Sequence, residues 1–140
     1  MAVLNDRSFK ASKTSLEFKI IEVESLSSKI KIIFNSGEHQ LEFEFLTLRE
    51  DVEMIYELIF NHWDELLKGG VWDATDPSFS FSIFENKSEI INDKIYRFQF
   101  WIDAGEFNCR RSTGSGIGIT IYQDRETIEK FALQLKKELG

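Results

Sequence analysis

The chain has 140 residues, with 24 acidic and 17 basic side chains that give a formal net charge of −7 at pH 7. This acidic balance argues against nucleic-acid binding, which needs a basic surface to displace counterions from phosphates. A hydrophobic content of 42%, with 13 phenylalanines, excludes intrinsic disorder and predicts a folded core. The length predicts a single domain over residues 1–140, in which residues 14–70 and 78–140 can form two βββα halves.

Three features of the sequence bear on the compartment. The N-terminal segment lacks the apolar stretch of a secretory signal. No apolar run reaches the roughly 18 residues that a membrane-spanning helix requires. Cys109 is the only cysteine, so an internal disulfide is excluded and a reducing compartment is favoured. We therefore expect a cytoplasmic protein that does not bind membranes.

The first third of the chain alternates apolar and polar residues, the period of half-buried antiparallel strands. Residues 1–13 are expected to form an irregular lead-in or a short edge strand. The alternation then predicts strands at 15–24, 29–35 and 39–46. A change of phase in the first of these predicts a β-bulge near Ile20 and Ile21. Outward lysines and glutamates on the other two strands can pair across the sheet.

A long amphipathic helix is predicted from Thr47 to Gly70. Its apolar residues recur at the i, i+3, i+4 spacing of a helix that buries one face. Thr47 followed by Glu50 reads as a capping box, and Gly69 with Gly70 supplies the end. The nine apolar positions are Leu48, Val52, Ile55, Tyr56, Ile59, Phe60, Trp63, Leu66 and Leu67.

The opposite face of this helix gathers acidic side chains. At about 100° per residue, Glu50, Glu53, Glu57 and Asp64 share one arc, and Asp51 lies beside it. Such a face commonly does no more than keep a helix solvated. It also provides a surface for a basic protein partner, because opposite charges steer association. Both interpretations stay open at this point.

The second half repeats the pattern of strands followed by a helix. Strict alternation predicts strands at 78–85, 94–103 and 117–123, with a further short strand at 106–111. Asp124 is expected to cap a last helix. The buried face predicted for that helix contains Ile128, Phe131, Ala132, Leu135 and Leu139. The fold class is therefore α+β: one antiparallel, aromatic-rich sheet of six or seven strands with two helices, in the order βββα-βββ(β)α.

Few residues offer recognisable catalytic or metal chemistry. The glycines near Gly116 open a strand rather than a helix, so they do not form a phosphate-binding loop. Arg110 and Arg111 beside Cys109 would favour its thiolate, but no histidine is brought to it by spacing. The cysteine and the two histidines have no ligand-like spacing, so neither a metal nor another cofactor is expected. The two arginines can equally bind an anion or pair with surface acids such as Glu106.

The three tryptophans are candidates for recognition or for the core. Trp63 belongs to the apolar arc of the central helix, so a core position is expected. Trp72, in the loop after two glycines, is a candidate ligand contact. Trp101 lies on the strand face opposite Phe98 and Phe100, where an open surface would form an apolar patch. We expect the last helix to cover that face.

Several segments resemble a family of bacterial proteins. These are the FQFWIDAG strand, the IGITIYQD strand and the closing TIEKFALQLKKEL helix, together with the acidic mid-chain helix. The combination is similar to the small acidic α+β proteins of bacterial toxin–immunity loci, including the WapI-like immunity group. The resemblance implies a non-enzymatic cytoplasmic protein that binds and blocks a cognate toxin domain, often a basic nuclease.

Three functions follow from these observations. The first is a protein-binding module of the immunity type, which uses the acidic helix face and is not an enzyme. The second is a small-ligand-binding domain with a pocket between sheet and helices, near Trp72, Trp101, Arg110 or Arg111. The third is an enzyme that uses Cys109.

Overall fold

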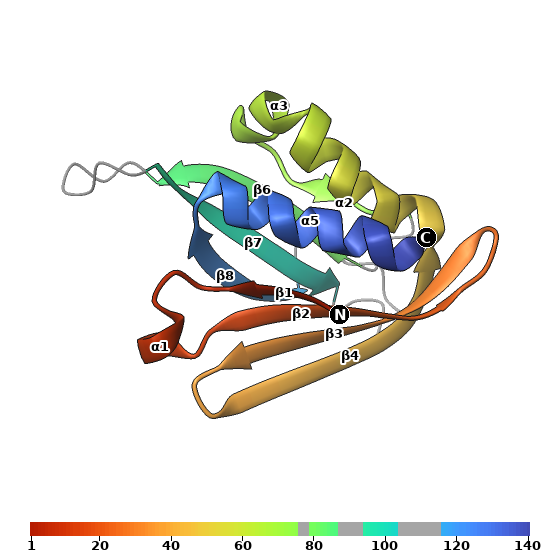
Figure 1. The fold of residues 1–140 in the computed structure, drawn as a ribbon, viewed down its shortest axis with the longest axis horizontal. Coiled ribbons are helices and arrows are strands. Elements are labelled where there is room, and N and C mark those ends of the chain that lie inside the picture. The colour runs from red at the N-terminus through yellow and green to blue at the C-terminus, as the bar shows by residue number, and fades with distance from the viewer. Residues whose placement is uncertain (76–78, 87–93, 104–115) are drawn as a thin grey trace.

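The computed structural model describes residues 1–75, 79–86, 94–103 and 116–140 (Figure 1). Within these residues, eight strands form two antiparallel four-stranded sheets, and four helices accompany them. The α+β class and the antiparallel pairing are therefore confirmed. The prediction of one sheet with six or seven strands and of two helices is wrong, because the two halves of the chain build separate sheets.

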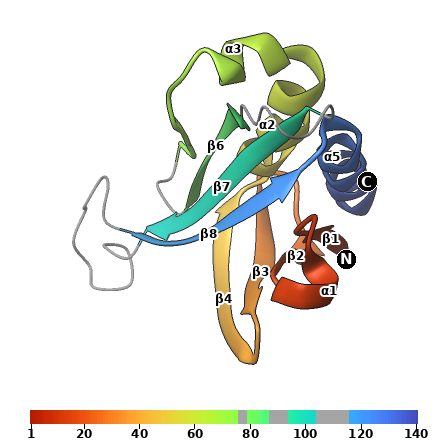
Figure 2. The same ribbon diagram turned by 90° about the vertical axis from the view of Figure 1, so that its left-hand side faces the viewer.

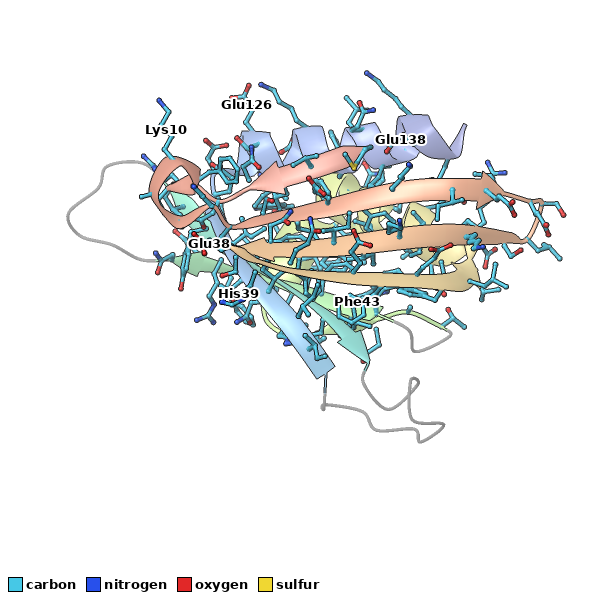
Figure 3. The ribbon with its side chains drawn as sticks, turned by 90° about the horizontal axis from the view of Figure 1, so that it is seen from below. Lys10, Glu38, His39, Phe43, Glu126 and Glu138 are labelled. Carbon is cyan, nitrogen blue, oxygen red and sulfur yellow. The ribbon has the colours of Figure 1, made fainter. Side chains whose placement is uncertain are left out.

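Sheet A is formed by the first third of the chain, and its strands lie side by side in sequence order. They are β1 (Ala2–Asn5), β2 (Ser15–Val23), β3 (Ser27–Ser36) and β4 (His39–Leu48). The register of β2 against β3 shifts between Ile20 and Glu22, which confirms the predicted bulge. Glu38 and His39 mark the turn between β3 and β4 (Figure 3).

The predicted pairing of lysines and glutamates across this sheet is also confirmed. Lys29 Nζ lies 3.2 Å from Glu44 Oε1, and Lys31 Nζ lies 4.0 Å from Glu42 Oε2. These side chains are partly exposed, so each pair contributes little to the free energy of unfolding.

Sheet B is formed by the second half of the chain. Its strands, again in sequence order, are β5 (Trp72–Asp73), β6 (Phe79–Asn86), β7 (Ile95–Asp103) and β8 (Gly116–Gln123). The strand predicted at 106–111 lies outside the described residues. Phe81, Phe100 and Ile119 stand opposite one another in register and are all buried, so one face of this sheet is apolar from edge to edge.

The buried faces of the two sheets meet through aromatic rings. Phe18 of sheet A lies 6.4 Å from Phe79 and 6.2 Å from Phe100 of sheet B, measured between ring centroids. Phe34 lies 6.3 Å from Phe100 in the same edge-to-face geometry. In Figure 2, β7 and β8 run obliquely to β3 and β4. One continuous core therefore joins both halves of the chain.

The helices complete this core. They are α1 (Phe9–Ser12), α2 (Arg49–Asn61), α3 (Trp63–Leu67) and α5 (Arg125–Leu139). Figure 1 shows α2 and α5 side by side, with α5 next to β1. The short α3 packs against β6.

The long central helix predicted from Thr47 to Gly70 is divided and begins later than expected. Thr47 pairs with Ser28 in sheet A, so it cannot cap the helix; Leu48 is the N-cap and makes no side-chain bond. His62, with φ −132°, separates α2 from α3. Gly70 has a φ of +113°, which fits the predicted end at the two glycines.

The buried arc of the central segment is largely as predicted. Val52, Ile55 and Ile59 of α2 are buried, and Trp63 of α3 is buried beneath Arg125, whose guanidinium carbon lies 4.7 Å from the ring centroid. Trp63 is thus a core residue, as expected. Leu48 is exposed, because it stands at the junction between β4 and α2.

The last helix agrees with its prediction. All five residues of its predicted apolar face are buried. Asp124 is the N-cap: its Oδ1 accepts a hydrogen bond from the Thr127 amide at 2.8 Å. That bond is the main reason why the pKa of Asp124 lies below its ordinary value.

Removing this cap should destabilise the protein measurably. We expect Asp124→Ala to lower the free energy of unfolding by about 1 kcal/mol, because the Thr127 amide loses its acceptor. Asp124→Asn keeps an acceptor oxygen and should cost only a few tenths of a kcal/mol. Urea unfolding of the two variants measures the difference, and equal losses would contradict a capping role.

Candidate functional site

A cleft of about 740 Å³ opens between α2, α5 and the segment that contains β5. We call it the acidic cleft. It is lined by Glu50, Asp51, Glu53, Met54, Tyr56, Glu57, Trp72, Thr75, Lys136, Leu139 and Gly140. The side chains that line it include four carboxylates and one ammonium group. The cleft therefore carries a concentrated negative charge.

Three of the four acids predicted from the helix face meet in this cleft. Glu50, Glu53 and Glu57 lie on successive turns of α2 and line the same wall. Asp64 does not join them, because the chain changes direction at His62 and Asp64 belongs to α3. The prediction that all four acids share one face assumed one continuous helix. It is wrong for Asp64, because the chain forms two helices, α2 and α3.

Two of these glutamates have basic neighbours at the rim. Arg49 Nε donates to Glu53 Oε1 at 3.0 Å, and His62 Nε2 lies 3.9 Å from Glu57 Oε1. Both glutamate side chains are about half exposed, so water screens these pairs strongly.

Asp51 contributes to the cleft in a different way. It is only 1% exposed, and its Oδ1 accepts a hydrogen bond from the Thr75 amide at 3.0 Å. This bond ties the first turn of α2 to the segment after β5, and Trp72 of β5 lines the same cleft. Sequence reasoning placed Asp51 beside the acidic arc, but its tie to Thr75 depends on tertiary structure.

Aromatic rings form the rest of the wall. Tyr56 stacks on Phe60 with a centroid distance of 4.5 Å. Lys136 of α5 places its Nζ 4.1 Å from the centroid of the Tyr56 ring, which is cation–π geometry. Trp72 is half-buried and contacts Phe79 and Phe81. An ammonium group thus rests on an aromatic ring that lines the same cleft as the carboxylates.

The other predicted site residues lie elsewhere. Trp101 is half-buried on the outer face of sheet B, where its ring lies over Gly118 so closely that a Cβ there would stand 2.5 Å from Trp101 Cδ1. The last helix was expected to cover this face, but α5 packs on the opposite one, with Phe131 6.2 Å from Phe98. That expectation is wrong.

The predicted cluster of Cys109, Arg110 and Arg111 lies outside the described residues. Within those that are described, no group of three or more histidine, cysteine, aspartate or glutamate side chains is arranged to hold a metal ion. The helices of the same residues are all too short or too polar to cross a membrane. Comparison of the chain with protein-family models, with curated proteins and with solved structures finds no match.

Proposed function

We propose that the protein is a non-enzymatic protein-binding module that recognises a basic partner through the acidic cleft. The observation that carries the proposal is that four acidic side chains, Glu50, Asp51, Glu53 and Glu57, line one cleft together with Tyr56 and Trp72. Lys136 lies on the Tyr56 ring and can offset only one of these four negative charges. A lysine or arginine of a partner would therefore meet the exposed carboxylates of Glu50 and Glu53 at the cleft.

Charge also favours a macromolecular partner. The whole chain carries −7, so a basic protein is attracted from a distance and guided to the cleft. Glu50 and Glu53 are exposed at its rim, where they meet a partner first. Trp72 and Tyr56 line the same cleft and offer the aromatic area that dominates binding energy in many interfaces.

The resemblance to toxin–immunity proteins suggests the class of partner. In that setting the protein would be cytoplasmic and would block a basic toxin domain, such as a nuclease, by occupying its positively charged surface. A pull-down from the native host that includes the products of neighbouring reading frames provides the partner for measurement.

Charge reversal in the cleft should slow association with this partner. We expect Glu53→Lys with Glu57→Lys to lower the association rate constant by about tenfold or more at low ionic strength, because steering is lost. Stopped-flow mixing at several salt concentrations measures the rate, and the wild-type rate should fall as salt rises.

A matched control separates the cleft from net charge. Glu126→Lys with Glu129→Lys changes the total charge equally, and each of these glutamates also has a basic neighbour on its helix. Glu126 projects outward from α5, away from the strands (Figure 3), and its side chain is 80% exposed. This control should slow association less than about threefold. Equal rates for the two double variants would refute the role of the cleft.

A small cationic ligand is the second candidate. The cleft volume of about 740 Å³ falls in the range of small-molecule sites. It also borders Trp72, where a ligand pocket was predicted. The two candidates depend on different residues: a small ligand needs the Tyr56 and Trp72 walls, whereas a protein also needs the exposed rim at Glu53.

A further inference from the structure

β8 is an edge strand of sheet B, and the groove beside it shares no lining residue with the acidic cleft. Tyr122 directs its backbone groups away from β7: its amide donates to Asp6 Oδ1 at 2.8 Å, and its carbonyl accepts from the Arg7 amide at 2.8 Å. Backbone groups of alternate residues in a strand point the same way. Thr120 and Gly118 therefore present their amides and carbonyls at this edge as well.

Within the described part of the chain, no backbone hydrogen bond reaches Gly118 or Thr120 on the side that faces away from β7. The chain's own segment at Asp6 and Arg7 completes the edge only beside Tyr122. Thr120 and Gly118 are the next two residues of β8 whose backbone groups face outward. They continue the edge at which Tyr122 already pairs with the segment at Asp6 and Arg7. This arrangement is the starting point for β-strand addition.

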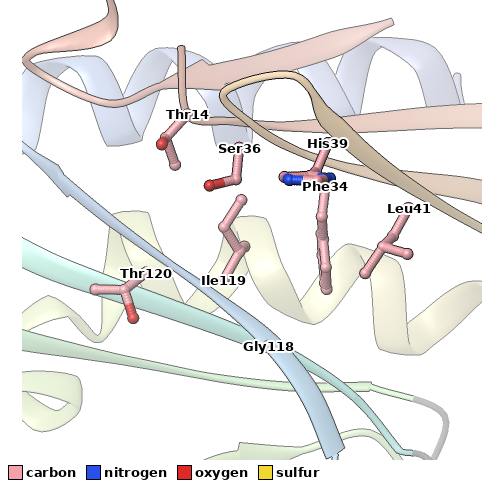
Figure 4. A pocket seen from close by; sticks show the side chains of 8 residues that line it. All are labelled: Thr14, Phe34, Ser36, His39, Leu41, Gly118, Ile119 and Thr120. Carbon is pink, nitrogen blue, oxygen red and sulfur yellow. The ribbon is translucent and has the colours of Figure 1, made fainter. Parts of the chain in front are cut away.

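A groove runs along the same edge. It has a volume of about 300 Å³ and lies between Gly118–Thr120 and the hairpin of β3 and β4 (Figure 4). Phe34, Leu41 and Ile119 supply its apolar surface, and Leu41 is 50% exposed. Among the described residues, its lining contains no aspartate, glutamate, lysine or arginine, although His39 is part of it. These residues offer no carboxylate, ammonium or guanidinium group to a charged side chain of an occupant.

We propose that an uncharged, extended segment of a partner protein adds to β8 as a strand beside Gly118 and Thr120. Its backbone would exchange hydrogen bonds with these two residues, as the segment at Asp6 and Arg7 does with Tyr122. Every second side chain would enter the groove and contact Phe34 and Leu41. The inference is independent of the acidic cleft, because no residue is shared between the two linings.

An uncharged model strand tests this docking mode on the full chain. The probe is the heptapeptide acetyl-Thr-Val-Thr-Val-Thr-Val-Thr-amide, titrated to millimolar concentration into ¹⁵N-labelled protein. We expect the amide resonances of Gly118 and Thr120 to shift and their hydrogen exchange to slow, since both amides become paired. Absence of any change at these two amides would overturn the proposal.

Backbone methylation of the peptide provides the matched comparison. One form is N-methylated at its threonines and the other at its valines, and only one set of amides faces β8 in a paired strand. One form should bind about tenfold more weakly than the parent, and the other should stay within about threefold. If both forms bind alike, the segment is not paired through its backbone and the proposal fails.

Variants of the protein test the same bonds from the other side. Thr120→Pro removes an amide that points away from β7, so the ladder between β7 and β8 keeps its bonds. It should weaken parent-peptide binding about tenfold, whereas Thr120→Ala keeps the amide and should stay within about threefold. Equal binding by both Thr120 variants would contradict pairing at Thr120. The double variant of the acidic cleft, Glu53→Lys with Glu57→Lys, should bind the peptide as tightly as wild type does.

Discussion

Replacing Phe100 with alanine is expected to lower the free energy of unfolding by about 3–5 kcal/mol, the usual cost of deleting a buried phenylalanine ring. Phe100 is 1% exposed and stands at the centre of the aromatic core. Its ring lies 5.5 Å from Phe79, 6.2 Å from Phe18 and 6.3 Å from Phe34, between centroids. The substitution therefore removes a ring that contacts two phenylalanines of sheet A, while the contact between Phe18 and Phe79 remains.

Urea unfolding followed by tryptophan fluorescence measures this loss. Phe9→Ala makes the same chemical change at a ring that is 38% exposed, and it should cost less than about 1 kcal/mol. Phe100→Leu keeps most of the volume and should cost about 1–1.5 kcal/mol, so it remains measurable if the alanine variant does not fold. Similar losses for Phe9→Ala and Phe100→Ala would show that the two sheets are not held together at this ring.

The strands could be predicted because alternation reports directly which side chains a sheet buries. In β7, Phe98 and Phe100 are buried as the period-two pattern requires. The same pattern carries no information about which strands are neighbours. One sheet and two packed sheets need the same alternation, and only the rings that meet across the core distinguish them. The division into sheets A and B therefore could not be predicted from the sequence.

The helix break at His62 was missed for a related reason. The apolar spacing from Ile59 through Trp63 to Leu66 suits one uninterrupted helix, and His62 is neither glycine nor proline. Its backbone leaves the helical conformation where α3 turns to pack on β6, and Trp63 of α3 also lies 4.9 Å from Tyr96 of β7 between ring centroids. Tertiary packing overrides local propensity at this position.

Only one wall of the acidic cleft could be predicted from the sequence. The helical period placed Glu50, Glu53 and Glu57 together, and the structure confirms their common face. The opposite wall comes from Lys136 of α5, which is 79 residues beyond Glu57 in the sequence. No periodicity connects such distant residues, so the cation–π contact with Tyr56 had no sequence signal.

The sequence did not indicate a role for Asp6, yet its carboxylate is hydrogen-bonded to two other segments of the chain. It is 8% exposed, and its carboxylate accepts hydrogen bonds from the Ser8 hydroxyl at 2.7 Å, the Ser8 amide at 3.1 Å and the Tyr122 amide at 2.8 Å. The Ser12 hydroxyl adds a longer contact of 3.5 Å. The carboxylate thus connects β1, α1 and β8.

These bonds determine the response to acid. Burial alone would raise the pKa of Asp6, but the bonds from Ser8, Tyr122 and Ser12 outweigh it and hold the pKa below its ordinary value of 3.8. A carboxyl whose folded-state pKa is lowered stabilises the fold fully above its unfolded pKa. That stabilisation disappears as the pH falls through the folded-state pKa, and Asp124 contributes in the same direction.

Asp6→Asn should therefore lower the free energy of unfolding by about 1–3 kcal/mol at neutral pH, because an amide oxygen replaces an ionised acceptor and its NH₂ group faces donors. The difference from wild type should stay the same from about pH 7 until the pH approaches the ordinary pKa of 3.8, and it should shrink as urea unfolding is repeated below that pH, since wild-type Asp6 becomes protonated while the variant cannot. Asp64→Asn, at an exposed position on α3, should change the free energy of unfolding by less than about 0.5 kcal/mol. A gap between wild type and Asp6→Asn that stays constant with pH would mean that lost packing, and not the ionised carboxylate, explains the cost.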